Sequence, residues 1–255
     1  MTLAFIAPPG VDFSANALRQ INTINNALPD FGAGLERLHL LRGDLESSAF
    51  DRAALVNRDF SEPFGPITFD SVRASAATRR DRIDYGDYEW DWAGGFTFAI
   101  ATRGPLTTDE TVFVASNSNI FNTTGLFFRI SAARRIRLQV AVDAGLAEAE
   151  IMRPSGFFPQ NNDVLIFCRF DPAAGNASVY TPDNDEIGTA ALSGSGTSNA
   201  DPNGARLLGD GTNTAARVSE ASLFASWNRP LSQAEMQAAY DNMKPWLAEQ
   251  GVEIR

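Results

Sequence analysis

From Leu38 onward, apolar side chains recur at every second position in one short run after another. The clearest run is GFTFAIAT, in which Phe96, Phe98 and Ile100 fall on one side of an extended chain. A period of two is typical of β-strands, because successive side chains of a strand point to opposite faces. Clusters rich in Asn, Asp, Gly, Ser and Pro separate the runs, as turns do. Many short strands divided by turns predict a two-sheet sandwich or a barrel.

One run is apolar at nearly every position rather than at alternate ones. VLIFCRF, residues 164–170, predicts a central strand that is buried on both faces. Its Cys168 is the only cysteine, so no disulfide can form within the chain. We expect a buried thiol there rather than a nucleophile, because a thiol among apolar neighbours keeps its proton.

Composition limits the kinds of partner. The chain has 255 residues, of which 44% are hydrophobic, which is enough to fill the core of one large all-β domain. Its net charge is −10, whereas nucleic-acid recognition and anionic membranes both call for a basic surface. No apolar stretch approaches the roughly 20 residues that a membrane span requires. We therefore expect neither nucleic-acid binding nor membrane insertion.

Residues 1–37 differ from the rest, and we treat them as an arm that precedes a second unit at 38–255. Within the arm, Ser14 can cap a short helix that ends near Pro29. One side of this helix carries an apolar stripe, made of Leu18, Ile21, Ile24 and Leu28. So short a helix is marginal alone and needs a partner. Two interpretations stay open: the arm packs on its own domain, or it serves docking and oligomerisation.

The start of the arm also bears on where the protein is found. MTLAFIAPPGVDF has no basic region and too short an apolar run for a secretory signal peptide. We therefore expect the protein to stay in the cell that makes it, or to leave by a route other than general secretion.

The strongest local signal lies near the other end of the chain. Ser232 followed by Glu235 forms a capping box, and Leu231 and Met236 are spaced for a hydrophobic staple. These features predict a helix that starts after a strand ending at Trp227. We expect this helix to close an edge or cover a face of the sandwich.

This strand–turn–helix resembles the C-terminal end of concanavalin A-like (laminin G/pentraxin-like) jelly-roll domains. The residues that carry the resemblance are Val218, Ser219, Glu220, Phe224, Arg229, Leu231, Ser232 and Glu235. LHLLRGDLESSAF also resembles the opening strand and loop of that family, and DWAGGFTFAIATRG its first long core strand. The resemblance covers about residues 38–250. It implies an all-β fold, a two-sheet antiparallel jelly-roll sandwich, here with an N-terminal helical arm and a C-terminal helix.

A jelly roll with such a helix, a short arm and no secretion signal is similar to phage virion proteins. The resemblance implies a non-enzymatic structural, decoration or adhesion protein on the head surface or tail of a virion. The implied partners are other virion proteins, sister subunits in a homo-oligomer (a trimer is favoured) and a cell-surface glycan. Two alternatives stay open: a glycan-active enzyme of the jelly-roll glucanase type, and a free extracellular lectin-like module.

The enzyme alternative depends on Glu89 and Asp91, which a strand would place on one face. Jelly-roll glucanases carry a pattern like E-x-D-x-x-E, and here Gly94 and Gly95 stand near the place of the second glutamate. Retaining glycoside hydrolysis needs two carboxyl groups in register. The single histidine, His39, lies in an apolar strand and suits a core position better than a catalytic one. We therefore predict no catalytic residues.

An aromatic cluster is the first candidate for ligand contact. Its members are Tyr85, Tyr88, Trp90 and Trp92. Such rings offer large amphipathic surfaces on which the C–H faces of sugars can stack. The alternative is that the rings pack over the edge of the sandwich.

Oxygen-rich loops are the candidates for a metal. The resemblance requires no cofactor and implies Ca²⁺ as an optional ligand, held by aspartate, asparagine and backbone oxygens. The residues that we assign to such a site are Asp183, Asp185, Asp210 and Asn213. The alternative is that these loops are ordinary turns, in which Asp, Asn and Gly serve backbone geometry.

Overall fold

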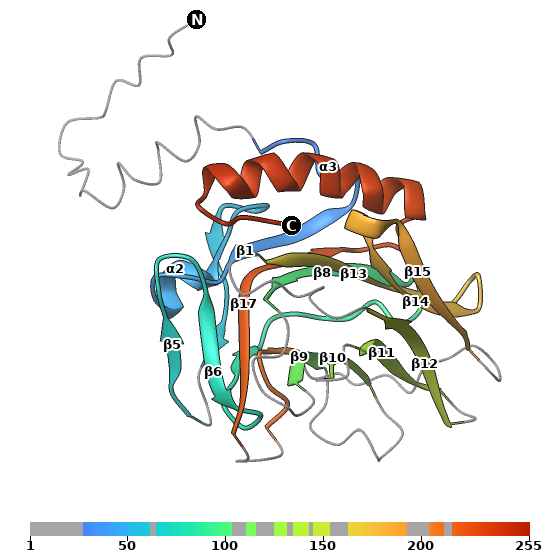
Figure 1. The fold of residues 1–255 in the computed structure, drawn as a ribbon, viewed down its shortest axis with the longest axis horizontal. Helices are drawn as coiled ribbons and strands as arrows, with labels where there is room; N and C mark the ends of the chain where they lie inside the picture. The colour runs from blue at the N-terminus through green and yellow to red at the C-terminus, as the bar shows by residue number, and fades with distance from the viewer. Residues whose placement is uncertain are drawn as a thin grey trace, which may run out of the picture.

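Two large antiparallel sheets stack face to face, and a long helix lies on the outer side of one of them (Figure 1). The two sheets confirm the predicted sandwich. The computed structural model describes residues 28–61, 65–103, 111–115, 125–131, 135–142, 145–153, 163–192, 204–211 and 216–255. Within these ranges, no helix is long and apolar enough to cross a membrane.

The eight-stranded sheet has the order β15-β14-β13-β8-β17-β6-β5, with β1 paired to β17 beside this path. Its strands are β1 (Leu35–Leu40), β5 (Ile67–Phe69), β6 (Ala74–Thr78), β8 (Phe96–Thr102), β13 (Val164–Asp171), β14 (Asn176–Thr181), β15 (Glu186–Ala191) and β17 (Ala216–Trp227). β8 is central, and its Ile100 pairs with Ile166 of β13 and with Phe224 of β17.

The seven-stranded sheet has the order β12-β11-β10-β9-β16-β7-β4. Its strands are β4 (Phe60–Ser61), β7 (Ile83–Tyr85), β9 (Thr111–Ala115), β10 (Leu126–Ile130), β11 (Arg135–Val142), β12 (Gly145–Met152) and β16 (Ala205–Leu207). Outside both sheets, the chain forms the hairpin β2 (Phe50–Asp51) and β3 (Val56–Asn57), helix α2 (Leu45–Ala49), the 3₁₀ turn η2 (Pro182–Asn184) and helix α3 (Gln233–Glu249).

The inner faces of the two sheets form the main core. Phe96, Phe98 and Ile100 of β8 all point into it, as their alternation predicts. Phe98 meets Phe128 of the opposite sheet with ring centroids 6.1 Å apart. The buried apolar surface between the sheets supplies the main driving force for folding.

A second core lies between the eight-stranded sheet and α3. Leu165 and Phe167 of β13 face the helix, while Ile166 and Cys168 face the other sheet. β13 is therefore buried on both sides, which confirms the prediction from its continuous apolar run. Met236 of α3 is fully buried in this second core, so the helix closes the outer face of the sheet as expected.

Helix α3 begins as its sequence predicts. The Ser232 hydroxyl accepts from the backbone N–H of Glu235, and the Glu235 carboxylate accepts from the backbone N–H of Ser232 at 2.8 Å. Pro245 does not end the helix, which continues to Glu249. Gly251 follows with a φ of +80°, a left-handed conformation that glycine adopts without strain.

The arm is described only from Leu28, so Leu18, Ile21 and Ile24 lie outside the described residues. Leu28 itself packs against the second core. Phe31 is buried, and its carbonyl oxygen accepts a 3.1 Å hydrogen bond from Nε1 of Trp227. The packed body therefore includes residues that precede position 38.

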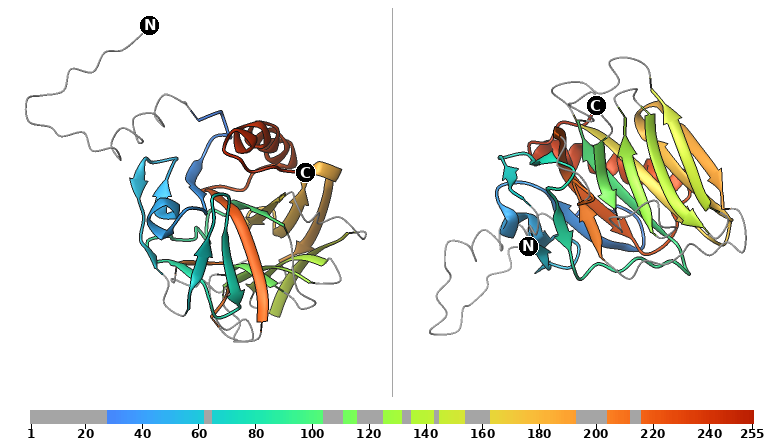
Figure 2. Two further views of the ribbon diagram at one scale, coloured as in Figure 1. Left: turned by 60° about the vertical axis from the view of Figure 1, so that its left-hand side comes forward. Right: turned by 90° about the horizontal axis from the view of Figure 1, so that it is seen from below.

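The edges of the two sheets meet on one side of the sandwich, where β12 runs beside β15 (Figures 1 and 2). Gly188 of β15 makes this approach close, because a Cβ there would overlap the backbone carbonyl of Glu150.

Candidate functional site

The aromatic cluster lies mostly inside the body. Tyr85, Tyr88 and Trp90 belong to the main core and are 0%, 2% and 6% exposed. The rings of Tyr88 and Trp90 meet edge to face at 4.7 Å, and half-buried Trp92 packs on Phe170 at 5.5 Å. Rings packed on one another leave little surface on which a sugar could stack. Their arrangement corresponds to the packing alternative.

The carboxylates of the enzyme alternative do not share a strand face. Glu89 and Asp91 lie between β7 and β8, outside any strand, so the period-two assumption fails there. Oδ1 of Asp91 accepts from the backbone N–H groups of Ala93 at 3.2 Å and Gly94 at 2.7 Å. Asp91 therefore holds a turn, while Glu89 is exposed.

The histidine and the cysteine both occupy core positions. Burial is the main cause that lowers the pKa of His39 to about 4, so the ring is neutral at pH 7. Burial also raises the pKa of Cys168, which keeps its thiol protonated. Neither group suits a role as nucleophile or general base.

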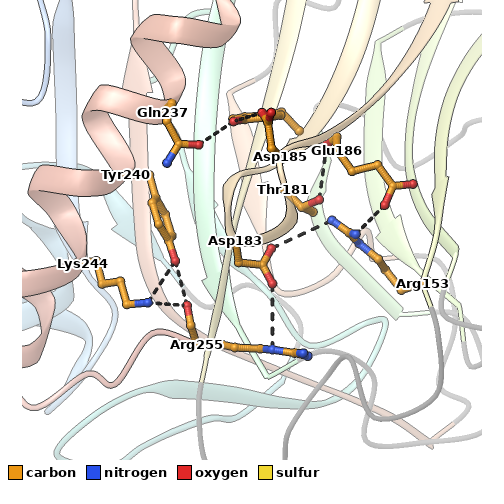
Figure 3. Close-up of polar contacts among 10 residues, drawn as sticks. Arg153, Thr181, Asp183, Asp185, Glu186, Gln237, Tyr240, Lys244 and Arg255 are labelled. Carbon is orange, nitrogen blue, oxygen red and sulfur yellow. Dashed lines mark hydrogen bonds and ion pairs between the residues drawn. The ribbon is translucent and has the colours of Figure 1, made fainter.

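A polar cluster forms where η2, the end of β12 and the last residue of the chain come together beside α3 (Figure 3). Asp183 of η2 lies between two arginines: its Oδ1 is 3.9 Å from Nη2 of Arg153, and its Oδ2 is 4.0 Å from Nε of Arg255. Arg153 also binds the carboxylate of Glu186. On the α3 side, the Tyr240 hydroxyl donates to the Arg255 carbonyl oxygen at 2.8 Å. We call this group of side chains, with Asp185 and Lys244, the η2 cluster.

Asp183 is the most unusual member of the η2 cluster. Only 9% of its side chain is exposed, and both carboxylate oxygens are buried. Burial raises its pKa, against the opposing effects of Arg153, Arg255 and hydrogen bonds from the backbone N–H groups of Asn184 and Asp183 itself. Burial likewise lowers the pKa of Arg153.

Asp185 closes η2 in a left-handed conformation, with a φ of +49°. Its Oδ1 lies 2.9 Å from the Tyr180 hydroxyl and accepts from Nε2 of Gln233 at 2.9 Å. The same hydroxyl lies 2.6 Å from Oε1 of Gln237. Since a hydroxyl has one proton, it can donate to only one of these acceptors at a time. These contacts fasten η2 to the first turns of α3.

The described residues among those assigned to Ca²⁺ each face a partner within the protein. Asp183 faces arginines, Asp185 binds Tyr180, and buried Asp210 forms an ion pair with Arg79. Asn213 lies outside the described residues. In the part of the chain that the structure describes, no group of three or more His, Cys, Asp or Glu side chains could hold a metal ion.

A charged ladder lies on the outer face of the seven-stranded sheet, across β10, β11 and β12. Arg137 of β11 pairs across the strands with Glu150 of β12, with Nε and Oε2 2.6 Å apart. Glu148 lies 3.6 Å from Arg137 and 3.9 Å from Arg129 of β10. These side chains remain partly exposed, whereas the residues between them on each strand point into the main core.

Two apolar side chains of β12 flank the charged ladder. Leu146 and Met152 are 47% and 48% exposed. Sequence reasoning did not point to this surface, whose arginines Arg135 and Arg137 belong to a strand. Both arginines lie in β11. The signal was the charge at alternate positions of RIRLQ and of GLAEAEIM.

No protein-family model matches the chain, and no curated protein matches its sequence. Among solved structures, it is similar to the botulinum neurotoxin type G receptor-binding domain, with a TM-score of 0.61 and 14% identity over 83% of this chain and 52% of that one. The receptor-binding domain of botulinum neurotoxin D aligns with a TM-score of 0.62 and 9% identity, over 82% of this chain and 53% of that one. The binding domain of botulinum neurotoxin DC in complex with SialylT aligns with a TM-score of 0.60 and 8% identity, over 84% of this chain and 52% of that one. The chain thus spans about half the length of these neighbours, and identities this low show a shared β-sandwich fold alone.

Proposed function

We propose that this chain is a non-enzymatic structural, decoration or adhesion protein of a phage particle. Its concanavalin A-like sandwich is displayed on the head surface or tail, where it contacts neighbouring particle proteins and a host-surface glycan. The arm, with Leu18, Ile21, Ile24 and Leu28, attaches the body to the particle or to sister subunits.

The outer face of the seven-stranded sheet is the observation that carries this proposal. A sandwich has four sheet faces, and here two of them form the main core while α3 covers a third. The fourth carries Arg137, Glu148 and Glu150, partly exposed, with Leu146 and Met152 beside them. Charged pairs bordered by apolar side chains are suited to a protein contact, since the charges set orientation and the apolar groups supply buried area.

The solved neighbours support a binding role. Their titles name receptor-binding domains, one in complex with SialylT and one with rat synaptotagmin II. A shared fold does not fix a function, so this support is an analogy. The positions of His39 and Cys168 point the same way, because burial keeps the imidazole neutral and the thiol protonated.

Particle incorporation tests the structural half of the proposal. We expect mass spectrometry of purified virions to detect the chain, and a variant lacking residues 1–27 to be lost from them. Arg137→Glu should also reduce incorporation, because it places three acidic side chains together on the charged ladder. Glu249→Gln, on an exposed position of α3, is the control that should leave incorporation unchanged. Absence of the wild-type chain from virions would refute the particle role.

A glycan array with and without calcium tests the adhesion half. We expect binding to some glycans without a requirement for added Ca²⁺. A uniformly silent array would remove the adhesion role. Release of reducing sugar from β-glucans by the purified chain would instead favour the enzyme alternative.

A further inference from the structure

We infer that the charged ladder is a docking surface for a second copy of this chain, which binds face to face about a twofold axis. The axis runs parallel to the strands, between β11 and β12. This inference rests on the proposed role of the ladder in protein contact, and it adds the identity of the partner and the arrangement of the pair. The ladder lies on the side of the body opposite α3 (Figure 1).

The charges of the ladder are sorted by strand. Five charged residues occur in β10, β11 and β12: Arg129 in the first, Arg135 and Arg137 in the second, and Glu148 and Glu150 in the third. They point outward, because the residues between them on each strand belong to the main core. The outward side of β12 is therefore acidic, and that of β11 is basic.

A twofold rotation about this axis brings unlike charges together. It places β12 of one copy over β11 of the other and shifts neither along the strand direction. Glu150 is in register with Arg137 within the chain, so the rotation also sets it over the partner's Arg137. The partner's Glu150 lies over Arg137 in return, because a twofold contact is reciprocal. Sheets stacked face to face lie about 10 Å apart, a gap that these side chains fill from both copies.

Other twofold arrangements bring like charges together. An axis across the strands places β12 over the partner's β12, so that glutamates face glutamates. An axis between β10 and β11 sets Arg129 over the partner's Arg137, since these two residues are paired in register within the chain. Like charges that face each other repel. Of the three arrangements, the axis between β11 and β12 alone pairs arginine with glutamate.

The central pair has capacity for a further contact. The side chains of Arg137 and Glu150 are 18% and 29% exposed. Both side-chain contacts of Glu150 in the described structure, with Arg137 and Arg135, use Oε2. Oε1 can therefore accept from a guanidinium of the second copy, since each carboxylate oxygen is an acceptor. The contact then joins two arginines and two glutamates in one network.

Apolar side chains border the charges at both ends of β12. Leu146 and Met152 are 47% and 48% exposed. They are in register with Ala141 and Arg135 of β11. The same rotation sets Leu146 over the partner's Ala141, and Met152 over the aliphatic stem of the partner's Arg135. The pair thus buries apolar area on either side of the charged centre, which exposed ion pairs alone do not supply.

The size of this surface limits the strength of the contact. β11 and β12 have eight residues each, so together they cover about 27 Å by 10 Å. The outward side of β10 adds little, because Phe127 is already buried there. The pair buries less than the roughly 1,200–2,000 Å² of a stable complex, and we expect a dissociation constant on the order of 0.1 mM. Many copies on one particle would raise the local concentration above this value.

Sedimentation equilibrium of the full chain, from about 10 μM to 1 mM, measures the association. We expect the wild type to dimerise. Arg137→Glu and Glu150→Arg should each raise the dissociation constant at least about tenfold, because each sets like charges over one another twice. Glu249→Arg reverses a charge at an exposed position of α3 and should leave the dissociation constant unchanged.

Combining the two substitutions separates this pairing from damage to the fold. The double variant with Arg137→Glu and Glu150→Arg keeps an ion pair within the chain and between the copies, so its dissociation constant should return to within about threefold of the wild type. An equimolar mixture of the two single variants should also associate, because one presents two acidic side chains at these positions and the other two basic ones.

An unchanged dissociation constant in either single variant would overturn this pairing, as would a folded double variant that stays as weak as the single ones. A wild type that remains monomeric up to about 1 mM would exclude a second copy as the partner. If Arg137→Glu were still lost from virions in that case, the proposed particle contact would stand with a different protein on the ladder. The particle role itself falls only if the wild-type chain is absent from virions.

Discussion

The hydroxyl of Tyr85 in β7 donates a hydrogen bond to Nε2 of His39 in β1 across 3.0 Å, and both residues are fully buried. The other ring nitrogen, Nδ1, lies 3.0 Å from the carbonyl oxygen of Ser48, which can only accept. The proton of the neutral ring is therefore on Nδ1, and Nε2 is free to accept. Protonation would put a second proton on Nε2, directed at the hydroxyl that now donates to it.

This pair predicts a loss of stability in mild acid. The pKa of His39 is about 4 in the folded chain and 6.5 when exposed, because burial disfavours the charged ring. The unfolded chain therefore takes up a proton as pH falls below 6.5, while the folded chain does not until about pH 4. The stabilisation is complete above pH 6.5 and falls by about 3 kcal/mol by pH 4.

Urea unfolding of the wild type and His39→Gln at several pH values isolates this effect from that of the carboxylates. The difference in the free energy of unfolding between the two should shrink as pH falls from 7 to 4. A difference that stays constant over this range would show that His39 titrates normally in the folded state.

Gly188 predicts where the two sheets cannot tolerate an added atom. A Cβ there would overlap the carbonyl oxygen of Glu150 and lie 2.7 Å from its carbonyl carbon, and backbone atoms cannot rotate away. We expect Gly188→Ala to lower the free energy of unfolding by about 1–3 kcal/mol, since overpacking forces backbone shifts. Thr189→Ala, at the exposed neighbouring position, should change it by less than about 0.5 kcal/mol. Equal effects of the two substitutions in urea titrations would contradict the close approach of β12 and β15.

Removing the capping box of α3 should cause a modest loss of stability. Ser232→Ala removes the acceptor for the backbone N–H of Glu235, and we expect it to cost about 1 kcal/mol. Ser232→Asn keeps an oxygen in the same place and should retain most of the stability. Thermal unfolding of both variants checks this, and similar losses in the two would show that the cap does not stabilise the helix.

The contact between Glu235 and Arg229 predicts a low pKa for the Glu235 carboxyl, which can be measured. The Arg229 guanidinium donates to Glu235 at 2.7 Å, and with the N–H and hydroxyl of Ser232 it lowers the pKa of that carboxyl to about 2. The stabilisation from this group is present above its usual value near 4.5 and is lost as pH falls towards 2. In an NMR titration, Arg229→Gln should move the Glu235 pKa upward. A carboxyl that titrates at the same pH in both proteins would exclude the arginine as the main cause.

The sequence could predict elements whose local signal and tertiary environment agree. The alternation around Phe98, the continuous apolar run around Cys168 and the Ser232–Glu235 box each gave the correct element. Each of these signals is local, because side-chain alternation and cap hydrogen bonds involve residues only a few positions apart. They were enough to predict two sheets, a doubly buried strand and a closing helix.

In strands β6 and β12, the local signal and the tertiary environment do not agree. β12 reads GLAEAEIM, and its Ala, Glu, Leu and Met are strong helix formers that the neighbouring β11 holds in an extended conformation. β6 reads ASAAT, and its alanines give almost no alternation although Ala74 and Ala76 are fully buried. In both strands, the pairing with other strands decides the conformation, because propensity alone is a weak constraint.

The tertiary structure alone decided which polar and aromatic groups are available to a partner. Tyr85, Tyr88 and Trp90 look like a binding surface in the sequence, but the sheets close over them. The surroundings of Asp183 come from Arg153 and Arg255, at distant positions in the chain. Exposure and charge at a site depend on which distant segments the fold brings together, and no local pattern of residues records that.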